Sequence, residues 1–202
     1  MDLYSQQYPS LYHRGRVTTF TRSDSRTTSY FGGPGLRVIQ GKKHGTMPLH
    51  HLATISTSDA GIRASRFGDS IPFFYGMSYG DCELEYQLPP YDMKVASSPW
   101  IHVTHIDPAT SSDRWPYADY PKLLPYIPLA IKETAEMPLE TFSDYVMQGI
   151  EAASDDELIL VVPPNAHMGV SLWGPRGDAE DVQIIFIYNI QSGSMRAYNA
   201  CT

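Results

Sequence analysis

Three short segments of the chain carry side chains that could together act on a dinucleotide: Leu11–Arg16 (LYHRGR), Ala53–Gly61 (ATISTSDAG) and Ser154–Pro164 (SDDELILVVPP). The arginines of the first segment are always charged and can hold phosphate oxygens with a planar fork. The hydroxyls of the second segment donate and accept hydrogen bonds, so they can fix a carboxylate and a ribose. A carboxylate in the third segment could stabilise the positive charge that develops when a glycosidic bond breaks.

Strands are expected to position these residues. Polar and apolar residues alternate over Arg16–Arg22 and over His51–Ser58, and an apolar, β-branched run covers Glu157–Val162. Each pattern predicts a strand. Between the second and third segments, two prolines make Leu123–Ala135 at best a broken helix.

The best helix signal lies just before the third segment. Pro138 suits the first helical position, and apolar residues then recur at spacings of three and four along Leu139–Ala153. With many short strands around one or two helices, the sequence predicts an α+β fold, with a single domain of mostly antiparallel strands over residues 11–202. The polar residues 1–10 are expected to form a flexible arm.

Composition and charge restrict the class of protein. The chain has 202 residues, is 42% hydrophobic and 18% charged, and so is globular rather than disordered. Its net charge is −7, but residues 1–43 carry seven bases and two acids. An anion could bind near this basic part, although solvated surface charges are the more ordinary explanation.

The sequence also indicates where the protein works. It has no basic-then-apolar N-terminal signal, and its longest apolar runs, such as Leu158–Val162, are too short to cross a bilayer. We therefore expect a soluble protein that is cytoplasmic or delivered without a cleaved signal peptide. Acidity and the lack of a glycine-rich phosphate loop give no reason to expect a nucleic-acid partner. Cys82 and Cys201 leave a single disulfide bridge open.

The ordered set of three segments resembles the arginine–serine–glutamate class of mono-ADP-ribosyltransferases. LYHRG resembles the family's aromatic–arginine–glycine opening, ISTSDAGIRASRFG its Ser-Thr-Ser strand, and DDELILVVPPNAHMGV its Glu-x-Glu strand. The resemblance implies NAD as the substrate and a macromolecular acceptor of unknown identity. It implies the catalytic residues Glu157, Ser56 and Asp155 and the NAD-binding residues Arg14, Arg16 and Ser58.

The sequence departs from the family pattern in several places. His13 stands between the tyrosine and Arg14, so either Arg14 or Arg16 could be the counterpart. Asp155 replaces the first glutamate of Glu-x-Glu, and the long interval before it requires an insertion, placed over residues 100–153. A rival Glu-x-Glu, which ends at Glu85, lies closer to the Ser-Thr-Ser.

Two other patterns favour different functions. His102, His105 and Asp107 form HVTHID, which could hold a metal with ligands from elsewhere or pair a histidine base with an aspartate, but ordinary strand-end histidines explain it better. The repeated YPxL at Tyr8–Leu11 and Tyr120–Leu123 looks like the late-domain motif of viral structural proteins. The alternative to an enzyme is therefore a non-catalytic binding or structural protein, either a virion component or an inhibitor-type partner.

Overall fold

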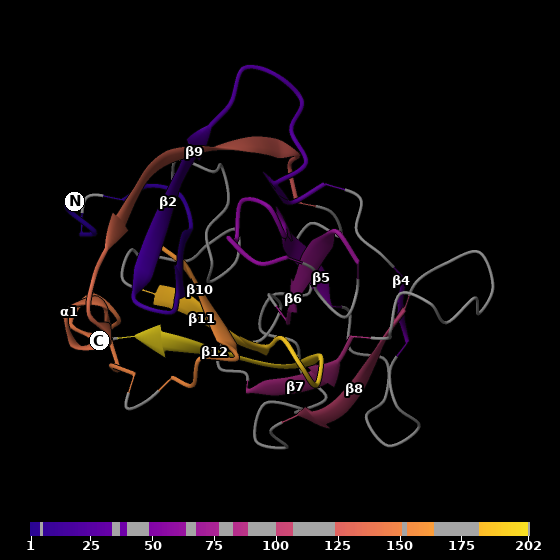
Figure 1. The fold of residues 1–202 in the computed structure, drawn as a ribbon. Coiled ribbons are helices and arrows are strands. Elements are labelled where there is room, and N and C mark those ends of the chain that lie inside the picture. The colour runs from indigo at the N-terminus through magenta and orange to yellow at the C-terminus, as the bar shows by residue number, and fades with distance from the viewer. Residues whose placement is uncertain are drawn as a thin grey trace.

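The chain folds around one curled, mostly antiparallel sheet of 12 strands in the order β4-β8-β7-β12-β11-β10-β1-β2-β9-β3-β5-β6 (Figure 1). A computed structural model describes residues 1–4, 6–33, 37–39, 49–63, 68–76, 83–88, 100–106, 124–150, 153–163 and 182–201. The strands are β1 (Ser10–His13), β2 (Arg16–Arg22), β3 (Tyr30–Phe31), β4 (Arg37–Ile39), β5 (His50–Ser56), β6 (Ser70–Tyr75), β7 (Leu84–Gln87), β8 (Trp100–Ile106), β9 (Ile127–Glu136), β10 (Glu157–Val162), β11 (Val182–Asn189) and β12 (Ser194–Cys201).

The predicted α+β class is wrong, because the described residues are essentially all-β. Their one α-helix is α1 (Leu139–Ser143), and it covers only the start of the helix expected over Leu139–Ala153. The Ser143 hydroxyl explains the early end, because it accepts a hydrogen bond from the Ile150 amide (2.6 Å) and donates one to the Ile150 carbonyl (3.1 Å). A serine that satisfies backbone groups in this way competes with helical hydrogen bonding.

The region expected to hold an insertion supplies strands of the sheet itself. β9 lies between β2 and β3, where the two prolines had suggested a broken helix, and β8 pairs with β7 and β4. Pro128 is tolerated near the start of β9, where the neighbouring β3 is only two residues long. The strands within residues 100–153 are therefore integral to the fold.

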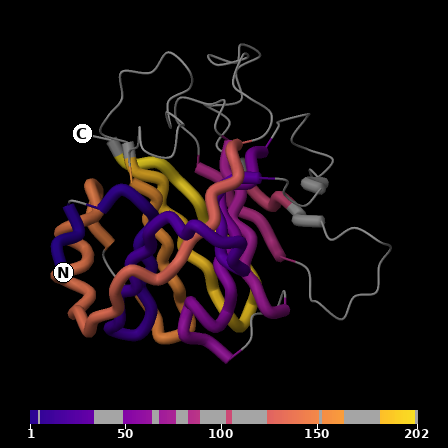
Figure 2. The backbone as a smooth tube through the Cα atoms, turned by 90° about the horizontal axis from the view of Figure 1, so that it is seen from above, coloured from indigo at the N-terminus to yellow at the C-terminus, as the bar shows by residue number. Residues whose placement is uncertain are grey.

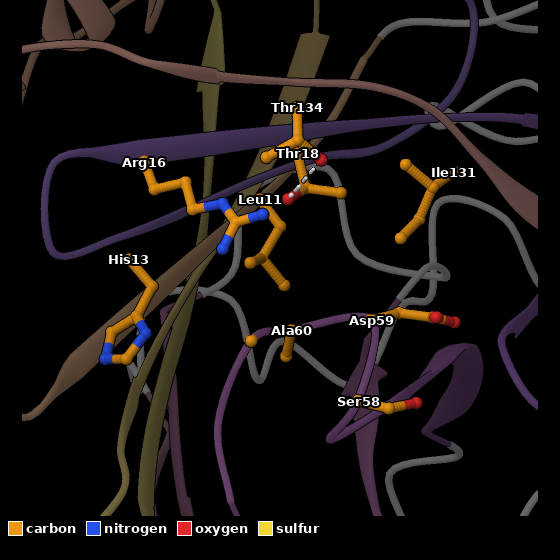
Figure 3. A pocket seen from close by; sticks show the side chains of 10 residues that line it. Leu11, His13, Arg16, Thr18, Ser58, Asp59, Ala60, Ile131 and Thr134 are labelled. Atoms are coloured by element: carbon orange, nitrogen blue, oxygen red, sulfur yellow. Dashed lines mark hydrogen bonds between the residues drawn. The ribbon is translucent and has the colours of Figure 1, made fainter.

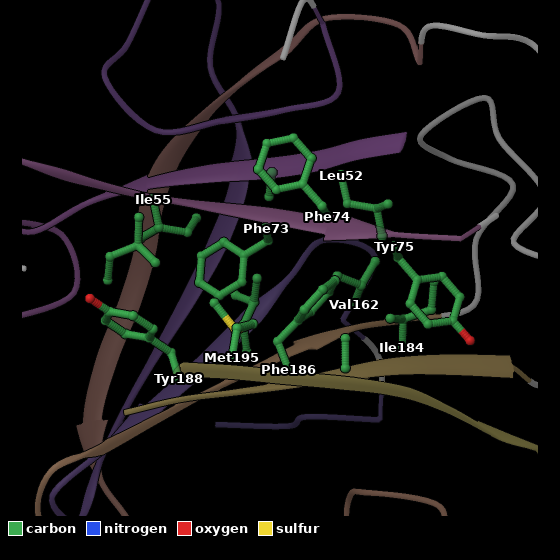
Figure 4. Packing of buried hydrophobic residues seen from close by; sticks show 14 of the residues in the cluster. Leu52, Ile55, Phe73, Phe74, Tyr75, Val162, Ile184, Phe186, Tyr188 and Met195 are labelled. Carbon is green, nitrogen blue, oxygen red and sulfur yellow. The ribbon is translucent and has the colours of Figure 1, made fainter. Parts of the chain in front are cut away.

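The inner face of the curled sheet carries the main hydrophobic core. β6 faces β11 and β12 across this core, and Phe73 and Tyr75 pack edge-on against Phe186 (ring centroids 5.2 and 6.4 Å apart) (Figure 4). Leu158 and Leu160 point to the same side from β10. Period-two alternation therefore fixes which β10 residues face this core.

The outer face of β1, β2, β10 and β11 carries a second cluster, which α1 covers. Tyr12 stacks on Phe142 (5.0 Å), and Ile159 and Val161 join them from β10. The start of the chain, expected as part of a flexible arm, lies against this layer at residues 1–4 (Figure 2). Leu3 is buried in the second cluster, and the Tyr4 hydroxyl donates to the Asp144 carbonyl (2.7 Å).

Candidate functional site

Arg14 lies in the two-residue turn between β1 and β2. Arg14 (φ 49°) and Gly15 (φ 73°) both adopt the left-handed conformation, as a tight hairpin turn of this type requires. The Arg14 Nε donates to the main-chain carbonyl of Asp155 (2.8 Å), and its Nη2 lies 4.0 Å from the Asp156 carboxylate. The Arg14 side chain therefore attaches the hairpin to the turn that precedes β10. It contacts the main-chain carbonyl of Asp155, and not the Asp155 carboxylate.

Ser56, at the end of β5, is buried and organises the turn that follows it. Its hydroxyl accepts a hydrogen bond from the Asp59 amide (3.1 Å) and lies 3.0 Å from the Ser58 hydroxyl. The Ser56 amide in turn donates to the Ser29 hydroxyl (2.9 Å), which itself donates to the Asp59 carboxylate. The Ser-Thr-Ser segment thus uses its hydroxyls to hold a turn together.

Glu157 lies apart from these residues, on the other face of the sheet. Alternation along β10 puts its side chain on the side of Ile159 and Val161, whereas His13 and Arg16 share the inner side with Leu158. Its carboxylate accepts a hydrogen bond from the Ser154 amide (2.8 Å), so it stabilises its own turn. The fold therefore does not bring Glu157 to Ser56 or Arg16.

The rival Glu85 does not join them either. It is exposed on β7, where the neighbouring Leu84 and Tyr86 point into the main core. Glu85 pairs across the strands with Arg196 on one side and His105 on the other. Neither glutamate lines the cavity beside the Ser-Thr-Ser turn.

A small cavity does bring Arg16 and Ser58 together (Figure 3). It lies between the inner face of the β1–β2 hairpin and the turn after β5, with His13 beside Arg16 and Asp59 beside Ser58. Partial burial lowers the pKa of His13, and the nearby Arg14 charge acts in the same direction. The volume is about 90 Å³. Known small-molecule sites usually measure roughly 300–1,000 Å³, so a dinucleotide does not fit inside it.

A much larger groove, of about 840 Å³, lies between the loop that precedes β3 and residues of β5, β6 and β9. We call it the tyrosine groove. Its lining residues are Asp24, Ser25, Arg26, Thr27, Thr28, Tyr30, Thr54, Asp69, Ser70, Tyr126 and Pro128. Its volume lies within the range of ligand sites, and hydroxyls, carboxylates, one guanidinium and two phenol rings line it.

The loop wall of the tyrosine groove is fixed to the start of β9. The Ser23 amide donates to the Pro128 carbonyl (2.8 Å), and the Leu129 amide donates to the Ser29 carbonyl (2.9 Å). The Thr27 hydroxyl also links this loop to β9, because it donates to the Ser29 carbonyl (2.6 Å) and accepts from the Leu129 amide (3.1 Å). Three hydrogen bonds to β9 and one within the loop therefore hold this wall in place before any ligand arrives.

Tyr30 and Tyr126 form an aromatic surface in the groove. Their ring centroids are 5.2 Å apart and the rings are inclined by 38°. Gly33 makes this packing possible, because a Cβ there would come within 2.9 Å of the Tyr126 ring. Tyr126 remains 41% exposed, so its ring presents apolar surface to a ligand.

Thr54, on the floor of the groove, is hydrogen-bonded to His51. A bulge in β5 skips Leu52, so that His51 and Thr54 lie on the same side and the ring Nε2 is 2.8 Å from the Thr54 hydroxyl. Burial lowers the pKa of His51 to about 4, so the ring is neutral at pH 7. Its Nδ1 lies 2.9 Å from the Gly32 carbonyl, which can only accept. Nδ1 therefore carries the proton, and the Thr54 hydroxyl must donate to Nε2.

Sequence reasoning missed the tyrosine groove. The serine, threonine and glycine residues of Ser23–Gly35 are typical of a loop and do not by themselves indicate a binding site. The signal that could have found it is the arginine and aspartate within this hydroxyl-rich stretch, followed directly by Tyr30. The contribution of Tyr126, almost a hundred residues later, has no local signal.

The other sequence patterns have different outcomes. His105 is exposed on β8, and Asp107 lies outside the described residues. In the first YPxL copy, Leu11 is buried in β1 at 1% exposure, so that copy is not an accessible linear motif; the second copy lies outside the described residues. Cys82 also lies outside them, so the structure does not test a bridge to Cys201.

Comparisons with known proteins add no relative: no protein-family model matches the chain, and neither curated proteins nor solved structures gave a match. Within the described residues, no three or more histidine, cysteine, aspartate or glutamate side chains are grouped as a metal site would require. No described helix has both the length and the apolar character needed to span a membrane.

Proposed function

We propose that the chain is a non-catalytic binding protein whose tyrosine groove holds a small polar ligand. The observation that carries this proposal is the groove itself, which combines ligand-sized volume with a wall already anchored by hydrogen bonds. Asp24 and Arg26 make no ion pair within the described part of the chain, so their charges are available to a ligand. Binding sites in proteins commonly combine a preformed hollow with a few polar groups of this kind.

A mixed library of polar small molecules tests the binding function. Compounds that raise the melting temperature are retested on Tyr126→Ala, which removes an exposed ring from the groove. We expect a clearly smaller shift, because a ligand stabilises the folded state only through its affinity. Tyr4→Ala is the matched control, since Tyr4 is an exposed tyrosine packed against Tyr145 in the outer layer. A shift that Tyr126→Ala retains in full contradicts the proposed site.

A mono-ADP-ribosyltransferase that uses NAD is the second candidate. Its support, beyond the sequence resemblance, is that Arg16 and Ser58 line one cavity. The position of Glu157 on the opposite face of the sheet and the small cavity volume count against it.

NAD decides between the two candidates. A transferase must be stabilised by millimolar NAD and must hydrolyse it, and Glu157→Gln must abolish hydrolysis. The binding protein that we propose shows no NAD turnover in either form. Turnover that disappears in Glu157→Gln would favour the second candidate over the first.

A further inference from the structure

The chemistry lining the tyrosine groove points to a particular class of ligand. Tyr126 and Tyr30 supply ring faces, and a ring face carries negative charge density that attracts weakly positive C–H groups. The polar side chains around the two rings include the carboxylates of Asp24 and Asp69 and the guanidinium of Arg26. Each carboxylate can accept two hydrogen bonds at once, and the guanidinium can donate two. A ligand that satisfies both surfaces has an apolar C–H face and a rim of adjacent hydroxyls.

The charge of the groove argues against an anionic ligand. Asp24, Asp69 and Arg26 are its charged residues among those described, and they sum to −1. Phosphate groups would therefore meet two carboxylates for one guanidinium, which is unfavourable at close range. A neutral ligand avoids this repulsion and can still form charge-assisted hydrogen bonds with all three side chains.

The floor of the groove has a fixed hydrogen-bond direction. Because the Thr54 hydroxyl gives its proton to His51 Nε2, its oxygen can only accept from a ligand. Thr28 has no such constraint, and its hydroxyl can rotate to donate or accept. In this site the Thr54 hydroxyl and the carboxylates of Asp24 and Asp69 accept hydrogen bonds, and the Arg26 guanidinium only donates them. This arrangement suits the hydroxyl groups of a ligand.

We propose, building on the binding function above, that the tyrosine groove binds a neutral saccharide. One sugar ring stacks its C–H face on Tyr126, and its hydroxyls donate to Asp24, Asp69 and Thr54 and accept from Arg26. The volume of about 840 Å³ accommodates more than one sugar ring, so a short oligosaccharide is the expected ligand.

An array of neutral oligosaccharides built from glucose, galactose, mannose, xylose and N-acetylglucosamine tests the proposal. Titration calorimetry with the best binder then compares variants of the full chain. We expect Tyr126→Ala to weaken binding by about tenfold or more, and Tyr126→Phe to change it by less than about threefold, because stacking needs the ring and not its hydroxyl. Tyr4→Ala should bind like the unaltered chain, and circular dichroism confirms that each variant is folded.

Two charge variants and two anionic probes complete the test. Asp24→Asn and Asp69→Asn should each weaken saccharide binding by about threefold or more, because a charged acceptor is lost. NAD and inorganic phosphate should not bind the groove. If no oligosaccharide binds, or if one binds equally well to Tyr126→Ala, the saccharide proposal is overturned. If another polar compound binds and Tyr126→Ala abolishes that binding, the saccharide proposal fails while the binding function stands.

Discussion

One extra residue in β5 determines what His51 can do. On a regular strand, residues three positions apart point to opposite faces, so His51 and Thr54 could not meet. The bulge at Leu52 removes one step of the alternation, and it also lets Leu52 and Ala53 both enter the main core. The result is a buried, neutral imidazole that is held at both nitrogens and sets the direction of the Thr54 hydroxyl.

The buried imidazole makes stability depend on pH. The pKa of His51 falls from 6.5 to about 4 in the folded protein, so between these values the unfolded chain binds a proton that the folded chain does not. Stability contributed by the neutral ring is therefore present above pH 6.5 and is lost as the pH falls towards 4. The loss amounts to about 3 kcal/mol.

The measurement compares the unaltered chain with His51→Asn in urea at several pH values. Asparagine can donate to the Gly32 carbonyl but does not titrate. We expect the unaltered chain to lose about 3 kcal/mol more than the variant over this interval. Equal slopes for the two proteins would mean that His51 is not held neutral.

Gly32 is a position where the backbone excludes every side chain. It has φ 63°, and a Cβ on it would collide with the Pro125 carbonyl. Gly32→Ala should therefore destabilise the fold by about 2–4 kcal/mol, from backbone strain and collision together. Gly15→Ala is the matched control, because Gly15 has φ 73° but open space around it, and it should cost only about 1 kcal/mol. Urea unfolding measures both, and equal costs would show that Pro125 moves aside freely.

At the scale of elements, local patterns predicted the strands better than the helix. Alternation correctly indicated β2 and β5, and a continuous apolar run correctly indicated β10, because one or both faces of these strands are buried against apolar clusters. The apolar spacing of Phe142, Val146 and Ile150 correctly indicated a buried face, yet only the first turn is an α-helix. After α1 the segment continues as turns whose hydrogen bonds join residues three positions apart, and these turns also bury Val146 and Ile150. The spacing of apolar residues alone does not distinguish such turns from a helix.

α1 is stabilised by its attachment to the outer face of the sheet rather than by its length. A helix of five residues is not stable on its own, and Phe142, which stacks on Tyr12, is fully buried. We expect Phe142→Ala to lower the free energy of unfolding by about 3–5 kcal/mol, from lost burial and the cavity that remains. Thr141→Ala, on the exposed side of the same helix, should change it by less than about 0.5 kcal/mol. A small effect of Phe142→Ala in urea unfolding would contradict this attachment.

At the scale of the whole molecule, the sequence could not predict which residues converge. The side of the sheet that Glu157 occupies follows from its spacing to Ile159, but the side that Arg16 occupies depends on how β1 and β2 pair. Likewise, the tyrosine groove unites Tyr30, Thr54 and Tyr126 only because β9 returns to lie beside β3. Long-range strand pairing, which no local pattern encodes, therefore decides both candidate sites.

The two apolar clusters lie on opposite faces of the same strands, which predicts how mutations combine. Phe186 packs against Phe73 on the inner face, and Phe142 packs against Tyr12 on the outer face. Phe186→Leu and Phe142→Leu should each cost about 1–2 kcal/mol, and because they share no partner the double variant should equal their sum within about 0.5 kcal/mol. Unfolding should nevertheless remain a single transition by circular dichroism and by hydrogen exchange, since β10 and β11 carry both clusters. A clear departure from additivity would mean that a shift in one cluster passes through the sheet to the other, so that α1 and the main core respond to each other.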